Sequence, residues 1–180
     1  TAEFGSAASS VKPIDSHARF IRRGLREGRR GLDLIGVTVE MHNPIDLMII
    51  MLGTNDCKTR YRASASVIAK GLDQVIRKAR QNASRHFDLL VISPIHLGVG
   101  VGDADFDPEF DAASVAVSRN LANEYRKIAL QNHAAFLNAS DFAAPSVTDR
   151  EHMDEKGHAA LADAIYNKIL ALQKGLSHVI

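Results

Sequence analysis

Two apolar runs of strand length, separated by a segment of helix length, constrain this 180-residue chain more than any other feature. Residues 46–52 (DLMIIML) are almost uninterrupted in their apolar character, and residues 87–93 (FDLLVIS) repeat the pattern before Pro94. Such runs are typical of strands buried on both faces, as in a parallel sheet covered by helices. Residues 134–138 (AAFLN) form a weaker third run, and we expect parallel strands at all three.

The segments between and after these runs have the apolar spacing of amphipathic helices. We predict helices over residues 63–81 and 114–133, and a last helix that begins after Asp154, whose side chain can cap it. The expected buried faces carry Val67, Leu72, Val75, Ile76 and Ala79, then Val115, Val117, Leu121, Tyr125, Ile128 and Ala129, and finally Ala159, Leu161, Ala162, Ile165, Ile169 and Leu170. Strands alternating with helices predict an α/β fold.

The composition excludes several classes of protein. Hydrophobic residues make up 46% and charged residues 24%, as in a folded globular domain, and the formal net charge is +1. We therefore expect neither a nucleic-acid partner nor a membrane partner held by charge. The single Cys57 allows no intrachain disulfide and no cysteine-based zinc site, and no cofactor is predicted. With neither a signal peptide nor a membrane-length apolar run, we expect a cytoplasmic location and leave secretion open.

The start and one loop depart from this pattern. Glu3-Phe4-Gly5-Ser6 matches the translation of two adjacent cloning sites, so residues 1–6 are interpreted as a cloning remnant and residues 7–180 as one domain. Five arginines cluster within residues 22–30, where a solvated helix face is favoured over an anion site. Residues 94–113 hold several glycines and aspartates and predict an exposed loop beside a site.

The turn after the first predicted strand offers one candidate site residue. Ligands of parallel sheets bind beyond the carboxyl ends of the strands, where Gly53-Thr54-Asn55-Asp56 follows residues 46–52. The glycine allows a sharp turn, and the Asn55 amide could then donate to the oxyanion of a tetrahedral intermediate. The alternative is an Asn side chain that bonds to the backbone of its own turn.

A second candidate precedes the last helix. In Asp149-Arg150-Glu151-His152 the acid lies three residues before the histidine and can accept its Nδ1–H, which leaves Nε2 as a base. This arrangement is half of a hydrolytic triad. The alternative is a surface histidine near a helix start.

Taken together, LMIIMLGTND (residues 47–56) and DREHMDEKGHAAL (residues 149–161) resemble blocks III and V of the SGNH (GDSL-like) hydrolase superfamily. PIDLMIIMLGTNDCK (residues 44–58) is similar to its arylesterase and acyltransferase-type branch, and the resemblance covers residues 31–180. It implies a flavodoxin-like three-layer α/β/α sandwich and hydrolysis of small-molecule carboxylic esters without a metal. Asn55 matches the oxyanion donor, His152 the general base and Asp149 its orienting acid, whereas His158 is expected at the surface.

The resemblance leaves the nucleophile unknown, because the Gly-Asp-Ser block of the family is absent. Gly5-Ser6 and Asp15-Ser16 are partial matches to that block. Block II can be aligned with Gly5-Ser6-Ala7, with residues 16–19 or with Gly28, so it is not assigned, and Ser16 is slightly favoured as a block II residue over a role as nucleophile. We therefore expect the first strand, with its serine and the following helix, to lie outside this chain. That strand is central in the family, so we expect a homo-oligomer or another chain to cover the exposed strand edges.

Three functions remain open at this point. The first is an esterase, or an acyltransferase, with a Ser-His-Asp mechanism, in which residues 94–111 shape acyl or alcohol selectivity. The second is a catalytically incomplete member of the same fold that acts as a binding or assembly module. The third is a flavodoxin-like or response-regulator-like binding domain, which is disfavoured because neither an acidic pocket nor a phosphate loop follows the first strand.

Overall fold

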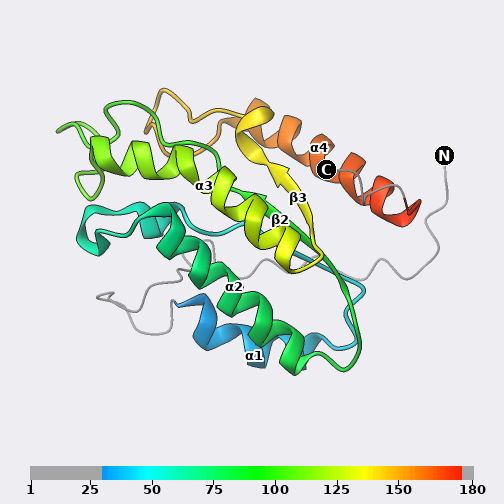
Figure 1. Cartoon of the computed structure of the whole chain (residues 1–180). Helices are drawn as coiled ribbons and strands as arrows, with labels where there is room; N and C mark the ends of the chain where they lie inside the picture. Colours follow the sequence, from blue (N-terminus) through cyan, green and yellow to red (C-terminus); the bar gives the residue numbers. More distant parts are fainter. Residues whose placement is uncertain (1–29, 176–180) are drawn as a thin grey trace.

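Three parallel strands form the centre of the computed structural model, which describes residues 30–175 (Figure 1). The strands are β1 (Leu47–Ile50), β2 (Asp88–Ser93) and β3 (Ala135–Asn138), in the order β1-β2-β3. Ile49 is in register with Leu90, and Leu90 with Ala135. The three predicted strands and their parallel pairing are confirmed, although β1 ends before Met51, where the chain leaves the sheet toward the turn at Gly53.

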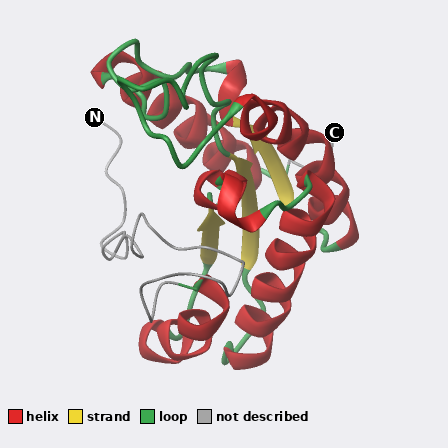
Figure 2. Ribbon diagram, turned by 90° about the vertical axis from the view of Figure 1, so that its left-hand side faces the viewer, coloured by secondary structure: helices red, strands yellow, loops and turns green. Residues whose placement is uncertain are grey.

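Helices cover both faces of this sheet (Figure 2). One layer contains α1 (Gly31–His42), α2 (Ala65–Asn82) and α3 (Ala112–Gln131), and α4 (Glu155–Gln173) lies against the other face. Short 3-10 helices stand at Thr54–Cys57 (η1), Thr59–Tyr61 (η2) and Ala139–Asp141 (η3). The three-layer α/β/α arrangement is confirmed. Helix α1 is an addition that the apolar spacing did not predict.

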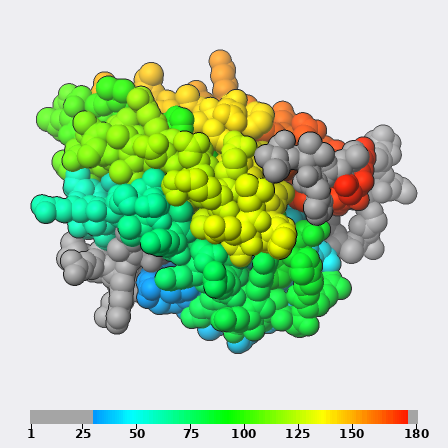
Figure 3. All heavy atoms as spheres, in the orientation of Figure 1, coloured from blue at the N-terminus to red at the C-terminus, as the bar shows by residue number. Residues whose placement is uncertain are grey.

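The alternation of side chains along β2 divides the core into two clusters. Leu89 and Val91 face α1, α2 and α3, in a cluster that includes Ile68, Leu72 and Ile76 of α2. Leu90 and Ile92 face the other way, toward Leu137 and Leu161. In the space-filling view the larger helical layer closes over its face of the sheet, with α2 and α3 side by side (Figure 3). Burial on both sides explains why β2 is apolar at almost every position.

The predicted buried faces of two helices need correction. In α2 Val67 is 48% exposed, and Ile68 takes its place in the core, because the face at positions 68, 72, 75, 76 and 79 has better helical spacing. In α4 Leu161 alone is fully buried, while Ala159 and Ala162 are exposed and Ile165, Ile169 and Leu170 are half-buried. Among the described residues α4 packs on β3 with few neighbours, which leaves much of its apolar face open. Its predicted N-cap is confirmed, since Asp154 accepts from the backbone N–H of Gly157 at 2.7 Å.

The loop after β2 is also less exposed than predicted. Ile95, Leu97, Val101 and Phe110 are buried and anchor residues 94–111 to the body of the protein. The glycines allow the turns between these anchors, so only the intervening positions, such as Val99 and Asp105, reach solvent. A loop fixed at four points can hold polar side chains in place beside a site.

Some predictions fall outside the described residues. They concern the cloning remnant at residues 1–6, the arginine cluster of residues 22–29, and the candidates Ser6, Ser16 and Gly28. Within residues 30–175, β1 pairs with β2 on one side and has no strand partner on the other. In the same range no helix is long and apolar enough to cross a membrane.

Candidate active site

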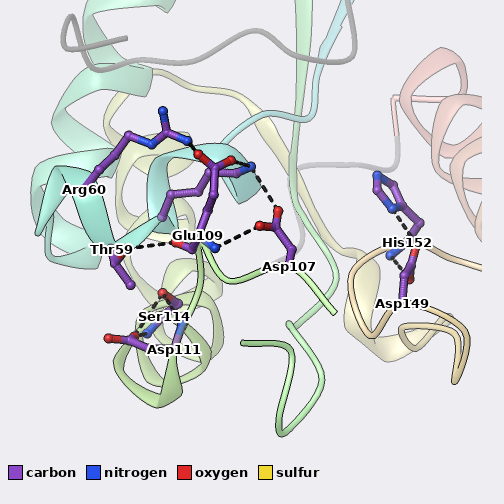
Figure 4. Close-up of polar contacts among 9 residues, drawn as sticks. Thr59, Arg60, Asp107, Glu109, Asp111, Ser114, Asp149 and His152 are labelled. Carbon is purple, nitrogen blue, oxygen red and sulfur yellow. Dashed lines mark hydrogen bonds and ion pairs between the residues drawn. The ribbon is translucent and has the colours of Figure 1, made fainter. Parts of the chain in front are cut away.

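Both candidate motifs lie beyond the carboxyl ends of the parallel strands. Asn55 belongs to η1, which follows β1, and Asp149 and His152 lie in the segment between η3 and α4, which follows β3. Because parallel strands end at the same edge of a sheet, the topology brings these segments, far apart in sequence, to one edge. Figure 4 shows Thr59 and Arg60, which follow the Asn55 turn, on one side and Asp149 and His152 on the other, with Asp107 of the 94–111 loop between them.

A buried tyrosine supports the turn that carries Asn55. Tyr125 of α3 donates its hydroxyl to the carbonyl of Leu52 at 2.9 Å, and burial, followed by the charge of Asp56, raises the pKa of Tyr125 well above its usual range. Gly53 has φ 128°, and a Cβ there would lie 2.3 Å from Tyr125 Oη. Glycine is thus required both by the backbone angle and by the close approach of the tyrosine.

The Asn55 side chain is half-buried and, among the described residues, takes part in no hydrogen bond. The structure therefore does not contain the alternative arrangement, in which the Asn55 amide bonds to the backbone of its own turn. Both amide N–H groups remain able to donate to a ligand.

Cys57 follows at the end of η1 and is not suited to act as a nucleophile. Its side chain is buried, and burial first, then the Asp56 charge, raises the pKa of the thiol to about 12. The thiol therefore stays protonated at neutral pH, and a thiolate is the nucleophilic form.

Asp149 and His152 form the predicted acid and histidine pair. The ring nitrogen Nδ1 of His152 lies 2.8 Å from Asp149 Oδ2. The other carboxylate oxygen, Oδ1, accepts from the backbone N–H of Glu151 at 3.0 Å and of His152 at 2.9 Å, and from the Ser146 hydroxyl at 3.1 Å. An ionised Asp149 accepts a hydrogen bond from Nδ1–H, which fixes the tautomer and leaves Nε2 as the basic nitrogen. The His152 side chain is 72% exposed, so Nε2 is accessible (Figure 4).

Hydrogen bonds keep Asp149 ionised. Its partial burial acts to raise the pKa of the carboxyl, but the N–H groups of Glu151 and His152 and the side chains of His152 and Ser146 outweigh that effect. The pKa of Asp149 is therefore held well below its usual range. Glu151, on the other hand, is half-buried, and burial raises its pKa against the opposing charges of His152 and Lys58.

Lys58 links the Asn55 turn to the neighbouring loop. Its ammonium contacts Asp107 at 3.2 Å and also pairs with Glu109, which in turn pairs with Arg60 (Figure 4). Thr59 donates its backbone N–H to the Glu109 carbonyl at 2.8 Å. A pocket of about 920 Å³ opens beside this cluster and is lined by residues 57–60 and 62–64 and by four residues at the start of α3 and just before it, but by none of the three candidate site residues.

Three supporting residues were not predicted from the sequence. Tyr125 was assigned to the core without a role for its hydroxyl, and Ser146 and Arg150 were not singled out. A tyrosine in a predicted core helix, combined with a glycine just after a strand, is a sequence signal that could have identified Tyr125. The contacts of Arg150 depend on a loop about 50 residues earlier in the sequence, and local sequence patterns do not predict contacts at that separation. Within residues 30–175 no serine hydroxyl is hydrogen-bonded to the His152 ring, and the nucleophile candidates Ser6 and Ser16 lie outside that range.

Comparison with known families decides the assignment. The model of the GDSL-like lipase/acylhydrolase family matches residues 15–160. The chain belongs to this family. GDSL-like acylhydrolases cleave ester bonds, so the predicted superfamily and the predicted class, an ester-hydrolysing enzyme, are confirmed. No curated protein sequence matches the chain.

Solved structures agree with the family. One crystal structure is 31% identical with a TM-score of 0.81, and the match covers 87% of this chain and 74% of that one. Est24, a carbohydrate acetylesterase from Sinorhizobium meliloti, is 25% identical with a TM-score of 0.78, covering 87% and 75%. The aryl esterase of M. smegmatis, 23% identical with a TM-score of 0.79 and covering 87% and 75%, shares the fold.

Proposed function

We propose that this GDSL-like enzyme hydrolyses small carboxylic esters, with His152 as general base, Asp149 as the acid that orients it, and Asn55 as oxyanion donor. The observation that carries the proposal is the 2.8 Å contact between His152 Nδ1 and an Asp149 carboxylate that hydrogen bonds keep ionised. That contact fixes the ring with Nε2 outward and stabilises the imidazolium that forms when Nε2 accepts a proton.

The reaction follows from these positions. A serine hydroxyl gives its proton to His152 Nε2 while its oxygen attacks the ester carbonyl, and the resulting oxyanion accepts a hydrogen bond from the Asn55 amide. The imidazolium then protonates the departing alcohol, which leaves an acyl-serine. Water, deprotonated by the same nitrogen, releases the acid. An acceptor alcohol in place of water would give acyl transfer by the same steps.

Short acyl groups are the favoured substrates in this proposal. The similarity to a carbohydrate acetylesterase supports acetyl esters. We expect the 94–111 loop, whose Val99 and Asp103 bind Arg150 beside His152, to select the acyl or alcohol part. p-Nitrophenyl acetate is a suitable first substrate because its alcohol is a good leaving group and makes few demands on the binding site.

A comparison of two histidine variants tests the proposal. His152→Ala should abolish the hydrolysis of p-nitrophenyl acetate, whereas His158→Ala, at an exposed position near the start of α4, should leave it intact. Equal rates in the wild type and His152→Ala would contradict the assignment.

The second candidate function is a catalytically incomplete member of the family that serves as a binding or assembly module. One observation favours it: within residues 30–175, one edge of β1 has no strand partner. The side chains of Ile49, in β1, and Met51, just after it, are 40% and 41% exposed. Unpaired apolar edges favour association with another chain. In that case hydrolysis would stay at background in both histidine variants and in the wild type.

A further inference from the structure

Arg150 has contacts that the hydrolytic mechanism does not use. It lies between the two members of the Asp149 and His152 pair, and its backbone is left-handed, with φ 59°. Its Nη1 donates to the carbonyl of Val99 at 2.8 Å and to Asp103 Oδ2 at 3.2 Å, and its guanidinium lies 4.2 Å from the centre of the Phe106 ring. All three partners belong to the loop after β2.

Backbone hydrogen bonds reinforce this connection. Gly98 donates its N–H to the Arg150 carbonyl at 2.8 Å, while Arg150 donates to Ser146 at 3.0 Å and Ser146 donates to His152 at 2.7 Å. The loop also leaves no space between itself and Arg150, because a Cβ on Gly98 would lie 2.8 Å from Arg150 Cβ and one on Gly100 would lie 2.0 Å from Nη1. The segment that carries His152 is therefore fixed to the loop by backbone and side chain together.

The same loop is fixed at its other end to Lys58 and Thr59, which directly follow the turn that carries Asn55. Asp107 donates its N–H to Val101 at 3.1 Å, and its carboxylate contacts Lys58. The backbone of Glu109 accepts from both the N–H and the hydroxyl of Thr59, at 2.8 and 3.0 Å. Residues 98–109 thus connect the segment that carries the proposed base to Lys58 and Thr59, which directly follow the turn with the proposed oxyanion donor. Figure 4 shows Asp107 and Glu109 of this loop between Thr59 and the pair of Asp149 and His152.

We propose that residues 98–109 act as a strut that sets the position of His152 relative to Asn55, and that Arg150 is the positioning residue through which the strut holds His152. The inference rests on the proposed function. A guanidinium suits this role because its planar face stacks on Phe106 while its edge donates to two acceptors, which a lysine ammonium cannot do in the same geometry. Small displacements of a general base lower the rate steeply, so a strut of this kind affects kcat more than KM.

The test replaces Arg150 by lysine and compares two readouts. One is the steady-state hydrolysis of p-nitrophenyl acetate. The other is the tautomer of His152, read from its ring ¹⁵N chemical shifts at a pH where the ring is neutral. Arg62→Lys is the matched control, because Arg62 also has a positive φ of 47°, is exposed, and makes no side-chain hydrogen bond, ion pair or ring contact with the described residues.

We expect Arg150→Lys to lower kcat about tenfold with KM changed less than about twofold, since a misplacement of about 1 Å can cost up to a hundredfold. The tautomer should move from the Nδ1–H form, held by Asp149, toward the Nε2–H form that an unconstrained histidine side chain prefers. Phe106→Leu, which removes the stacking surface from the loop side, should shift both readouts in the same direction. Arg62→Lys should leave both unchanged.

The outcomes separate the strut from the proposed function. If Arg150→Lys and Phe106→Leu leave the tautomer and kcat as in the wild type while His152→Ala abolishes hydrolysis, the strut is wrong and the catalytic assignment stands. If both variants shift the tautomer while His152→Ala has no effect on hydrolysis, the strut stands and the catalytic assignment fails. If Arg62→Lys changed kcat and the His152 tautomer as much as Arg150→Lys does, the effect would be one on the stability of the whole fold, and the inference would be overturned.

Discussion

Asp149 keeps its negative charge through hydrogen bonds. Four donors converge on its two oxygens, two of them backbone N–H groups whose positions follow from the turn. A carboxylate held in this way depends little on flexible side chains, so it can orient an imidazole that is itself 72% exposed. The acid also supports the fold of the segment before α4.

This charge predicts a pH-dependent contribution to stability. The fold lowers the pKa of Asp149 below its ordinary value of 3.8, so its stabilising effect is fully present above about pH 5 and is lost as the pH falls further. Asp149→Asn should therefore lower the melting temperature at pH 6, and the difference from the wild type should narrow toward pH 3. Thermal unfolding followed by circular dichroism measures this. Asp105→Asn, at an exposed loop position, is the control, and a difference that is independent of pH would contradict the assignment.

Asn55 is predicted to act on the transition state alone. Asn55→Ala removes a donor that meets its acceptor once the oxyanion has formed, so kcat should fall by about 10² to 10³ while KM stays nearly constant. Steady-state kinetics with p-nitrophenyl acetate separates the two constants, with Asn123→Ala on the exposed face of α3 as control. A raised KM at unchanged kcat would place Asn55 in substrate binding instead.

At the level of elements, helix α3 supports the turn after β1 through one hydroxyl. Tyr125→Phe leaves the Leu52 carbonyl without the partner it has at 2.9 Å, in a region where Tyr125 itself is fully buried. The variant should lose about 1–3 kcal/mol of unfolding free energy. Urea unfolding with an unchanged m value measures the loss, and Tyr166→Phe, at a half-exposed position in α4, should be neutral. Equal stability of the Tyr125 and Tyr166 variants would show that the hydroxyl does not support the turn.

The elements also show how far the sequence alone can predict this protein. The apolar runs located β1, β2 and β3, and Asp154 located the start of α4, because strand burial and helix capping leave local patterns. The spacing of Asp149 and His152 predicted their hydrogen bond, because an acid three residues before a histidine in the same turn can reach the histidine ring. By contrast, the exposure of α4 and the link between Arg150 and Phe106 depend on segments distant in sequence, which no local pattern records.

For the whole molecule, the unpaired edge of β1 within residues 30–175 predicts association. We expect the protein to sediment as an oligomer whose mass depends on concentration. Ile49→Lys, at this strand, should shift it toward the monomer, because a charged side chain at a strand edge opposes pairing with another chain. Val37→Lys, which replaces another exposed apolar side chain on α1, should not. A wild-type protein that is monomeric at every concentration would contradict the prediction.

In the proposed mechanism His152 activates a serine nucleophile, and covalent labelling of that serine detects the activation. A fluorophosphonate reacts with an activated serine and marks its peptide for mass spectrometry, so the experiment also identifies the nucleophile that the sequence leaves unassigned. When the strand that carries the serine is present, in the same chain or supplied by another, we expect one labelled serine peptide with wild-type His152 and none with His152→Ala. No labelled serine in that protein, or equal labelling with and without His152, would contradict the proposed mechanism.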